Sequence, residues 1–557
     1  MTVDNLRILS WAGLLILLWL CIQTWQQRFQ PQVPAAASVS TALPADTAAA
    51  PTAVSTGLPA LPGAVPAAAG PATPAVQADA PAPARLITIK TGVLEVEINL
   101  SGGDLSSVKL PTYPVHKDQP NVPLQLLNSQ SEAFFALQSG LRAADQQPEA
   151  NHLAEYTADG TEFVLAKGAD ELVVPLKWQS PSSGLSVVKT FRFHRDSFEV
   201  DLEYTVDNAG TEPYRAANYL QIQRHYEPPK RSMFNVDSYS FFGPVVYNGS
   251  KYEKLKVDDL AKAPFTQTVA KGWMAAIQHH FLAAAVPPAT ETWSYAGRYA
   301  EGRFLISAIG PLQTVAPGAS ASFKSELFVG PKLQSQLAAI APGLDLTVDY
   351  GRFALLAQPL FWILQKIHNV VGNWGLAIII CTLLIKLVFY KLSETSGRSM
   401  ARMRQMQPRM KALQERYKDD KQQLSSAMMD LYKKEKINPA AGCLPMLVQI
   451  PFFMAFYWVL LESVEMRQAP FMLWITDLSS RDPFFVMPLL MGAAMFFQQK
   501  LNPPPPDPVQ AKMMQAMPIV MTGMFAFFPA GLVVYWLTNS VLSIAQQWRI
   551  NKVLGAN

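Results

Sequence analysis

The polar side chains best placed to do chemistry in this sequence lie inside its most apolar segments. These residues are Thr382, Lys386, Gln449, Thr538, Asn539, Ser540 and Ser543. Thr382 and Lys386 are four residues apart, so a helix places them on one face. A charged side chain in the middle of a membrane helix costs about 2.5 to 3.5 kcal/mol, so it usually faces water or a partner. Lys386 therefore predicts a hydrated site within an apolar region.

Lys386 also has a simpler interpretation. It lies seven residues before Ser393, which corresponds to about 10 Å along a helix, and its long side chain could reach the membrane surface from there. The residues alone favour neither interpretation over the other.

The motifs of common enzyme active sites are absent from the sequence. It contains no GxxxxGK[ST], HExxH or GxSxG pattern and no Cys and His residues with the spacing of a metal site. His279 and His280 are adjacent, and in a strand they would point to opposite faces and could not chelate one ion. We expect no enzyme activity, no cofactor and no bound metal.

The composition indicates that part of the chain lies in lipid. Half of its 557 residues are hydrophobic and only 16% are charged, which is unusual for a soluble protein. We interpret residues 1–30 as an uncleaved signal anchor, because Gln26, Gln27 and Arg28 lack the A-x-A pattern of a signal peptidase site. A cleaved secretory signal is the alternative. Five further spans are expected at 374–392, 443–461, 483–498, 514–528 and 531–548.

The composition changes twice between the first span and the others. Residues 31–84 are rich in Ala and Pro and contain no aromatic residue, Lys or Arg, which predicts an extended linker. In residues 85–335, apolar residues alternate with polar ones. The alternation is clearest at Phe198, Val200, Leu202, Tyr204 and Val206. This pattern predicts a large antiparallel β-sandwich.

The charges of the loops predict the orientation in the membrane. Residues 351–370 mix apolar and polar positions in the manner of an amphipathic helix at the membrane surface, and residues 371–557 form the five-span core. Within that core, residues 393–438 carry eleven basic and six acidic side chains, an excess typical of the cytoplasmic side. We therefore expect six spans, both termini in the cytoplasm and the β domain outside.

Residues 393–438 also predict a helical hairpin. Apolar residues recur every three or four positions from Met403 to Tyr417 and from Leu424 to Leu431, on either side of a KDDK turn. The methionines could line a packing seam or offer a pliable surface to nascent chains. The basic side chains could contact ribosomal RNA or anionic lipid, because each contact needs only charge. The basic residues that we single out are Arg398, Arg402, Arg404, Arg409, Lys411 and Arg416.

Several long segments together resemble the YidC membrane-protein insertase family of Gram-negative bacteria. After a span with a basic residue and a charged hairpin come INPAAGCLPMLVQIPFFMAFYWVL from Ile437, ESVEMRQAPFMLWITDLSSRDPFFVMPLLMGAAMFFQQK from Glu462 and FFPAGLVVYWLTNSVLSIAQQW from Phe527. The resemblance implies that the β domain is a periplasmic supersandwich similar in shape to sugar mutarotases. It also implies a multi-pass protein of the bacterial inner membrane that inserts membrane proteins and helps them to fold.

The resemblance further implies which residues form the site. Family members place one positive charge, usually an arginine, in a hydrophilic groove open to the cytoplasm and to lipid, and Lys386 occupies that position. The other groove residues would be Thr382, Gln449, Tyr535, Trp536 and Asn539. Tyr535 and Trp536 could equally be packing or interfacial aromatic residues. The implied partners are nascent membrane proteins, the Sec translocon, membrane lipids and, through the hairpin, the ribosome, with no DNA among them.

Two other classes of protein fit parts of this pattern. A structural assembly factor for the Sec translocon would need the hairpin and the β domain but would tolerate a neutral residue at 386. An ion-coupled transporter would use an intramembrane lysine, but it would also show paired acidic residues and internal repeats, which the expected spans lack.

Overall fold

A computed structural model describes residues 58–61, 85–129, 132–230, 240–417, 420–435, 444–501 and 508–553. The expected anchor at 1–30 and nearly all of the expected linker at 31–84 lie outside the described residues. The described chain divides into two compact units. The β unit contains residues up to 351 together with 459–469, and the helical unit contains 352–458 and the chain from 470 onward.

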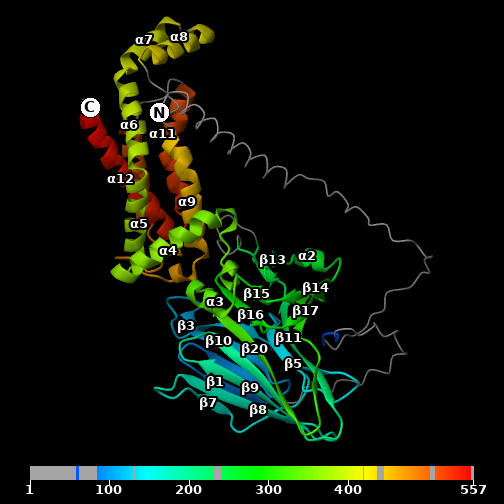
Figure 1. Ribbon diagram of the computed structural model, residues 1–557. Coiled ribbons are helices and arrows are strands. Elements are labelled where there is room, and N and C mark those ends of the chain that lie inside the picture. The colour runs from blue at the N-terminus through cyan, green and yellow to red at the C-terminus, as the bar shows by residue number, and fades with distance from the viewer. Residues whose placement is uncertain are drawn as a thin grey trace, which may run out of the picture. The chain divides into compact units, whose positions relative to one another are not determined.

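The β unit is built on two large sheets (Figure 1). The order of the first sheet is β14 (Phe265–Ala270), β17 (Thr292–Ala300), β18 (Arg303–Ile309), β11 (Tyr214–His225), β5 (Phe135–Ala143), β4 (Pro123–Asn128), β3 (Asp104–Pro114), β2 (Glu95–Asn99), β1 (Leu86–Lys90) and β7 (Glu162–Val164), with β19 (Gln313–Val315) paired to β11. The order of the second sheet is β13 (Tyr252–Lys254), β12 (Gly243–Tyr247), β15 (Trp273–Ile277), β16 (Phe281–Val286), β20 (Ser320–Pro331), β10 (Glu199–Asn208), β9 (Leu185–His194), β8 (Glu171–Gln179) and β6 (Thr157–Ala158).

The two sheets face each other, and the apolar side chains of alternate residues fill the space between them. Along β10 the expected alternation is confirmed, because every second residue from Phe198 to Val206 is at most 3% exposed. Hydrogen bonds cross the interface between the sheets, including one from Tyr204 Oη to Ser139 Oγ at 2.9 Å. The prediction of an antiparallel sandwich needs one correction, since β1 and β7 pair in parallel.

Short helices complete the β unit, and residues 459–469 are attached to it by hydrogen bonds. The short helices are α2 (Val257–Leu260), α3 (Gln334–Ile340), η2 (Leu344–Thr347) and η5 (Val464–Met466). Lys117 Nζ donates a hydrogen bond to the Gln468 carbonyl at 2.9 Å, and Arg467 Nη2 donates one to the Pro114 carbonyl at 2.8 Å. The Tyr350 and Ser463 hydroxyls also lie within hydrogen-bonding distance, 3.3 Å apart. A segment far away in sequence is thereby held by the β domain.

The helical unit contains most of the long helices (Figure 1). They are α4 (Ala354–Val371), α5 (Trp374–Val388), α6 (Tyr390–Gln405), α7 (Gln407–Arg416), α8 (Lys421–Lys434), α9 (Leu444–Glu462, whose last turn belongs to the β unit), α10 (Val486–Leu501), α11 (Pro508–Phe525) and α12 (Ala530–Val553), preceded by the short η3 (Gly351–Phe353). Gly372 ends α4 with a left-handed conformation (φ 67°) that glycine adopts without strain. Asn373 then caps α5 by accepting a hydrogen bond from the Leu376 amide.

A helix must be both long and apolar to span a membrane. Within the ranges that the structure describes, no single helix is both long and apolar enough to cross a bilayer. The pair α5 and α6 meets these requirements together, although the two helices meet at an angle of 70°. The expectation of six spans stays a prediction.

Candidate functional site

Three helices of the helical unit bring together the polar residues of the apolar segments. Lys386 lies near the end of α5, Gln449 in the first half of α9, and Asn539 and Ser543 in the middle of α12. Asn539 and Ser543 are four residues apart, so they share one face of their helix. Because α12 packs against α5, this face can meet Lys386.

Hydrogen bonds link these four residues in one continuous chain, which passes through both the backbone carbonyl and the side chain of Asn539. Lys386 Nζ donates to Ser543 Oγ at 2.7 Å, and Ser543 Oγ donates to the Asn539 carbonyl at 2.7 Å. The Asn539 side chain accepts a bond of 2.7 Å from Gln449 Nε2. The chain Lys386, Ser543, Asn539 and Gln449 thus joins α5, α12 and α9, and we call it the polar chain.

A small pocket, about 20 Å³ in volume, lies beside the polar chain. Its lining residues are Ile385, Lys386, Phe389, Leu392, Ser393, Val448, Gln449 and Phe452. Most of the wall is apolar, whereas Lys386, Ser393 and Gln449 offer hydrogen-bonding groups. Lys386 and Gln449 are half-buried, so each contributes to the polar chain and to the wall. The arrangement can hold a polar group next to a positive charge within apolar surroundings.

The structure places the other expected groove residues in packing positions. Thr382 is 1% exposed, and its hydroxyl donates a 2.7 Å hydrogen bond to the Ile378 carbonyl of its own helix. Tyr535 is 2% exposed and stacks on Phe456 with ring centroids 4.6 Å apart. None of the three residues Thr382, Tyr535 and Trp536 lines the pocket.

Trp536 packs among aromatic rings, with Phe453 at a centroid distance of 4.8 Å and Phe525 at 5.3 Å. Ser543 is one of the polar residues of the apolar segments but was not among the expected groove residues, and it is the residue that Lys386 contacts. Its position seven residues after Trp536 and four after Asn539 places all three on one helix face, and this spacing was the signal that could have found it.

The six basic residues that we single out in 393–438 lie on α6 and α7. Arg398 pairs with Glu394 at 2.6 Å within α6, and Arg409 pairs with Glu435 at 2.6 Å, which connects α7 to the end of α8. The exposed basic side chains are Arg398, Arg402, Arg409, Lys411 and Arg416, whereas Arg404 is half-buried. The methionines at 406, 410 and 428 are buried, which favours the packing seam over a surface for nascent chains at these three positions.

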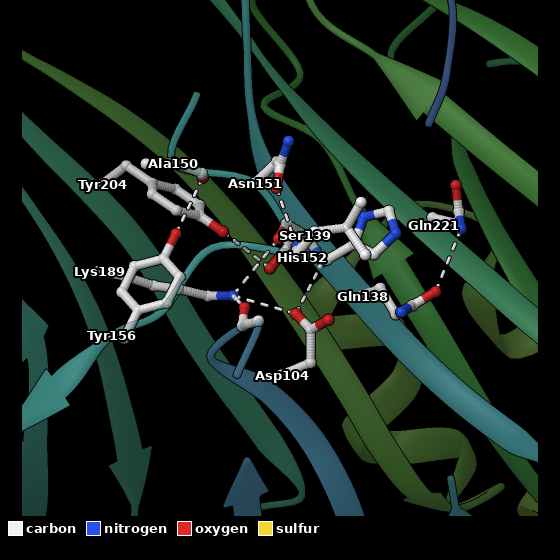
Figure 2. A network of polar contacts seen from close by, with 12 residues as sticks. Asp104, Gln138, Ser139, Ala150, Asn151, His152, Tyr156, Lys189, Tyr204 and Gln221 are labelled. Carbon is white, nitrogen blue, oxygen red and sulfur yellow. Dashed lines mark hydrogen bonds and ion pairs between the residues drawn. The ribbon is translucent and has the colours of Figure 1, made fainter. Parts of the chain in front are cut away.

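A second polar cluster lies inside the β unit and centres on a lysine (Figure 2). Lys189 is 0% exposed, and its ammonium donates to Asp104 Oδ1 at 3.1 Å and to the carbonyls of Gly102 and Ser139 at 3.4 Å. The rings of Tyr156, Phe191 and Tyr204 surround the same ammonium, with centroids 5.3 to 5.6 Å away. All three of its donors have acceptors, as a buried ammonium requires.

Burial moves the groups of this cluster toward their neutral forms. It raises the pKa of Asp104 to about 6, although Lys189 opposes the shift, and it lowers the pKa of Lys189. Burial and the nearby charges of Lys189 and Arg142 lower the pKa of His152 to about 4. Since Lys189 is fully enclosed, no substrate reaches it, and the cluster is a structural ion pair.

The sequence carried an overlooked signal for this ion pair. Buried and half-buried residues alternate along β9, and Lys189 occupies one of the buried positions. Leu185, Val187, Phe191 and Phe193 are the apolar residues of that face. A lysine among them is a charge directed into the sandwich.

The expectation for the two adjacent histidines was wrong in its geometry. His279 and His280 lie in the turn between β15 and β16, so they do not point to opposite faces of a strand. Their rings stack with centroids 3.7 Å apart, and both Nε2 atoms lie near the Leu461 carbonyl, at 2.9 and 3.1 Å. Among the described residues, no group of three or more His, Cys, Asp or Glu could hold a metal ion.

Comparison with known proteins covers both units. Residues 86–363 match the family model of the YidC periplasmic domain, and residues 366–556 match that of the 60Kd inner membrane protein. A membrane protein insertase YidC of Thioalkalivibrio sulfidiphilus is 49% identical over 99% of this chain and 98% of its own length. That of Nitrosococcus oceani is 48% identical over 84% of this chain and 85% of its own. A crystal structure described as an active YidC insertase is 16% identical, with a TM-score of 0.37, and the match covers 83% of this chain and 93% of that one.

Proposed function

Because this chain belongs to the YidC family of membrane protein insertases, we propose that it inserts proteins into the bacterial inner membrane through the pocket beside Lys386. The observation that carries this proposal is the position of the Lys386 ammonium. It lies half-buried at the wall of a pocket and donates a hydrogen bond to the neutral hydroxyl of Ser543. A positive charge with a neutral partner can attract a polar or acidic part of a substrate.

The barrier to insertion is the transfer of polar chain into hydrocarbon. Each unsatisfied peptide group costs several kcal/mol there, so a bare translocated tail cannot cross. The wall of the pocket supplies an ammonium, an amide and a hydroxyl from Lys386, Gln449 and Ser393. These groups would hydrogen-bond the polar end of a substrate during transit and lower that barrier.

The same helices offer an apolar surface to the part of the substrate that stays in lipid. On α5 the side chains of Leu383, Leu384, Leu387 and Val388 are 41 to 77% exposed. Exposed apolar surface of this kind is typical of a face that meets lipid or another helix. Partition of the new helix, at about 25 cal/mol per Å² of apolar surface buried, would drive the process without a nucleotide.

The topology belongs to the same proposal. The chain would cross the membrane six times, with residues 1–30 as anchor, residues 31–84 as linker, both termini in the cytoplasm and residues 85–335 in the periplasm. Residues 351–370 would lie at the membrane surface, and the hairpin at 393–438 would contact the ribosome or anionic lipid through its exposed arginines. The groove residues Thr382, Tyr535 and Trp536 would support the wall rather than contact substrate in the state described here.

Insertion into liposomes that contain only this protein tests the proposal. A small membrane protein should become protected from protease in these liposomes, whereas a structural factor for the Sec translocon would give no insertion. Ion flux across the same liposomes without insertion would support a transporter instead.

Cysteine labelling tests the site itself. In a background without Cys21, Cys381 and Cys443, a cysteine at 386 or 449 should react with a membrane-impermeant maleimide, because both positions line the pocket. A cysteine at 382 should stay unreactive, because that position is 1% exposed. If cysteines at all three positions fail to react with the maleimide, water does not reach the pocket, and the proposal is contradicted.

A further inference from the structure

Four residues of the expected linker, 58–61, contact the β unit. This segment has the sequence Leu-Pro-Ala-Leu and forms neither helix nor strand. Leu58 and Leu61 pack against the buried residues Ala217, Tyr219 and Ile309, as does Leu312. We call Ala217, Tyr219, Ile309 and Leu312 the linker patch. In Figure 1 the segment is the short blue piece near β11.

The linker patch lies on the outer face of the first sheet. Asn218, on β11, contacts Ser325 of the second sheet at 3.3 Å, so its side chain points between the two sheets. Its neighbours Ala217 and Tyr219 must point the other way, because side chains alternate along a strand. An outer face is normally exposed, yet these two residues are 0% exposed. They are covered from outside the sandwich, and the segment 58–61 is one of the elements that cover them.

Contacts within the β unit hold Tyr219 of the linker patch in place. The Tyr219 hydroxyl accepts a 3.1 Å hydrogen bond from the backbone amide of His152 and also bonds with His152 Nδ1. The rings of Tyr219 and His152 meet edge to face at 5.7 Å. Tyr219 and Ile309 are cross-strand partners between β11 and β18. Tyr219 of the patch is therefore held in place by groups of the β unit other than the segment, which lowers the entropy cost of binding.

The sequence of the segment suits this surface. Residues 31–84 contain three leucines, at 43, 58 and 61, and no Ile, Met, Phe, Tyr or Trp. In the polyproline II conformation, which Pro59 and Pro62 favour, three residues make one turn, so Leu58 and Leu61 share one edge. Their exposure agrees with this geometry, because Leu58 and Leu61 are half-buried whereas Ala60 is exposed. The two largest side chains of this part of the linker thus point to the same surface.

We propose that the linker patch is a binding site for the chain's own Leu58–Leu61 turn, and that this contact clips the linker to the β domain. The clip divides the linker in two. Without it, 54 residues (31–84) separate the expected anchor from the β domain, a reach of at most about 190 Å. With it, 27 residues (31–57) remain, and the limit falls to about 95 Å. The clip would thus restrict how far the β domain can move from the anchor.

Accessibility of a cysteine under the segment tests the clip in the full chain. Ile309→Cys, in a background without the native thiols, should react slowly with a maleimide because Ile309 is 4% exposed. Replacing both Leu58 and Leu61 by Ala should raise that rate roughly tenfold or more, because the apolar contacts that hold the segment are lost. The matched control is Leu43→Ala, which removes the other linker leucine and should leave the rate unchanged.

Two outcomes would overturn the proposal. One is an unchanged rate in the variant that lacks Leu58 and Leu61, and the other is an equal rise with Leu43→Ala. If Ile309→Cys does not fold, Ala217→Cys gives the same measurement at a neighbouring position of the patch with a smaller change of side chain. If the double leucine variant unfolds at the same temperature as the native chain, the faster reaction comes from detachment of the segment and not from unfolding of the β domain.

Discussion

The ammonium of Lys386 lies 2.7 Å from the hydroxyl of Ser543, a residue 157 positions later in the chain. The two residues come from α5 and α12, and the same serine bonds back to the Asn539 carbonyl of its own helix. The ammonium of a lysine in an apolar helix thus donates its hydrogen bond to a neutral side chain. Its charge is oriented without being neutralised, which is the property that a site for acidic or polar substrate segments needs.

Reversal of this charge should affect substrates according to their own charge. Lys386→Glu should impair insertion of proteins with acidic translocated segments more strongly than that of proteins with neutral segments, because like charges repel. Lys386→Arg should retain most of the activity. The measurement is protease protection of both substrate types in proteoliposomes. Lys391→Glu, an exposed lysine five residues away, is the matched control, and equal insertion of both substrates by Lys386→Glu would contradict the idea.

The bond between Gln449 and Asn539 should be measurable as a coupling between α9 and α12. Asn539→Leu removes the acceptor of a 2.7 Å bond and leaves the Gln449 amide without it, at a cost of about 1 to 3 kcal/mol. The double variant Asn539→Leu with Gln449→Leu should lose less free energy of unfolding than the two single variants lose in sum. Denaturant unfolding in detergent, followed by tryptophan fluorescence, gives the three values. Strict additivity would show that the bond does not couple the two helices.

The ion pair inside the β unit should be sensitive to the loss of one partner. Lys189→Met leaves the buried Asp104 carboxylate without its cation and should lower the free energy of unfolding by about 3 to 5 kcal/mol. Lys189→Met combined with Asp104→Leu should recover much of this loss, because no uncompensated charge remains. Thermal or denaturant unfolding of the full chain measures both. A double variant no more stable than Lys189→Met would indicate that the pair does more than balance charge.

His152 should make the β unit acid-sensitive. Its pKa is lowered to about 4 in the folded state from about 6.5 in the unfolded chain. Between these values the unfolded chain binds more protons, so stability is present above pH 6.5 and is lost as the pH falls toward 4. The loss reaches at most about 3 kcal/mol. Asp104 acts in the opposite sense, because its pKa is raised to about 6 and its contribution to stability decreases as the pH rises through that range.

A comparison with a variant isolates the histidine. His152→Gln keeps a polar side chain that does not titrate, while Asp104 remains in both proteins. The free energy of unfolding of the native chain should therefore fall more steeply between pH 6.5 and 4 than that of the variant. Parallel curves for the two proteins would show that His152 is not the acid-sensitive group.

Much of the architecture was predictable because burial leaves a periodic trace in the sequence. The alternation from Phe198 to Val206 predicted β10 and its buried face. The same rule applied to β9 would have found the inward position of Lys189. By contrast, the attachment of residues 459–469 to the β unit was not predictable. Its hydrogen bonds join backbone carbonyls, such as that of Leu461, to side chains far away in sequence. Backbone acceptors are the same for every residue type and leave no trace in the sequence.

The sequence by itself determined which side chains are polar in apolar surroundings, and helical spacing assigned Asn539 and Ser543 to one face. Only the tertiary structure decided that this face meets Lys386, that Gln449 joins it, and that Thr382 and Tyr535 turn into the packing instead. The physical reason is that periodicity fixes the direction of a side chain relative to its own helix. The partner it meets depends on how the helices pack, which is set by many weak contacts between segments far apart in the chain.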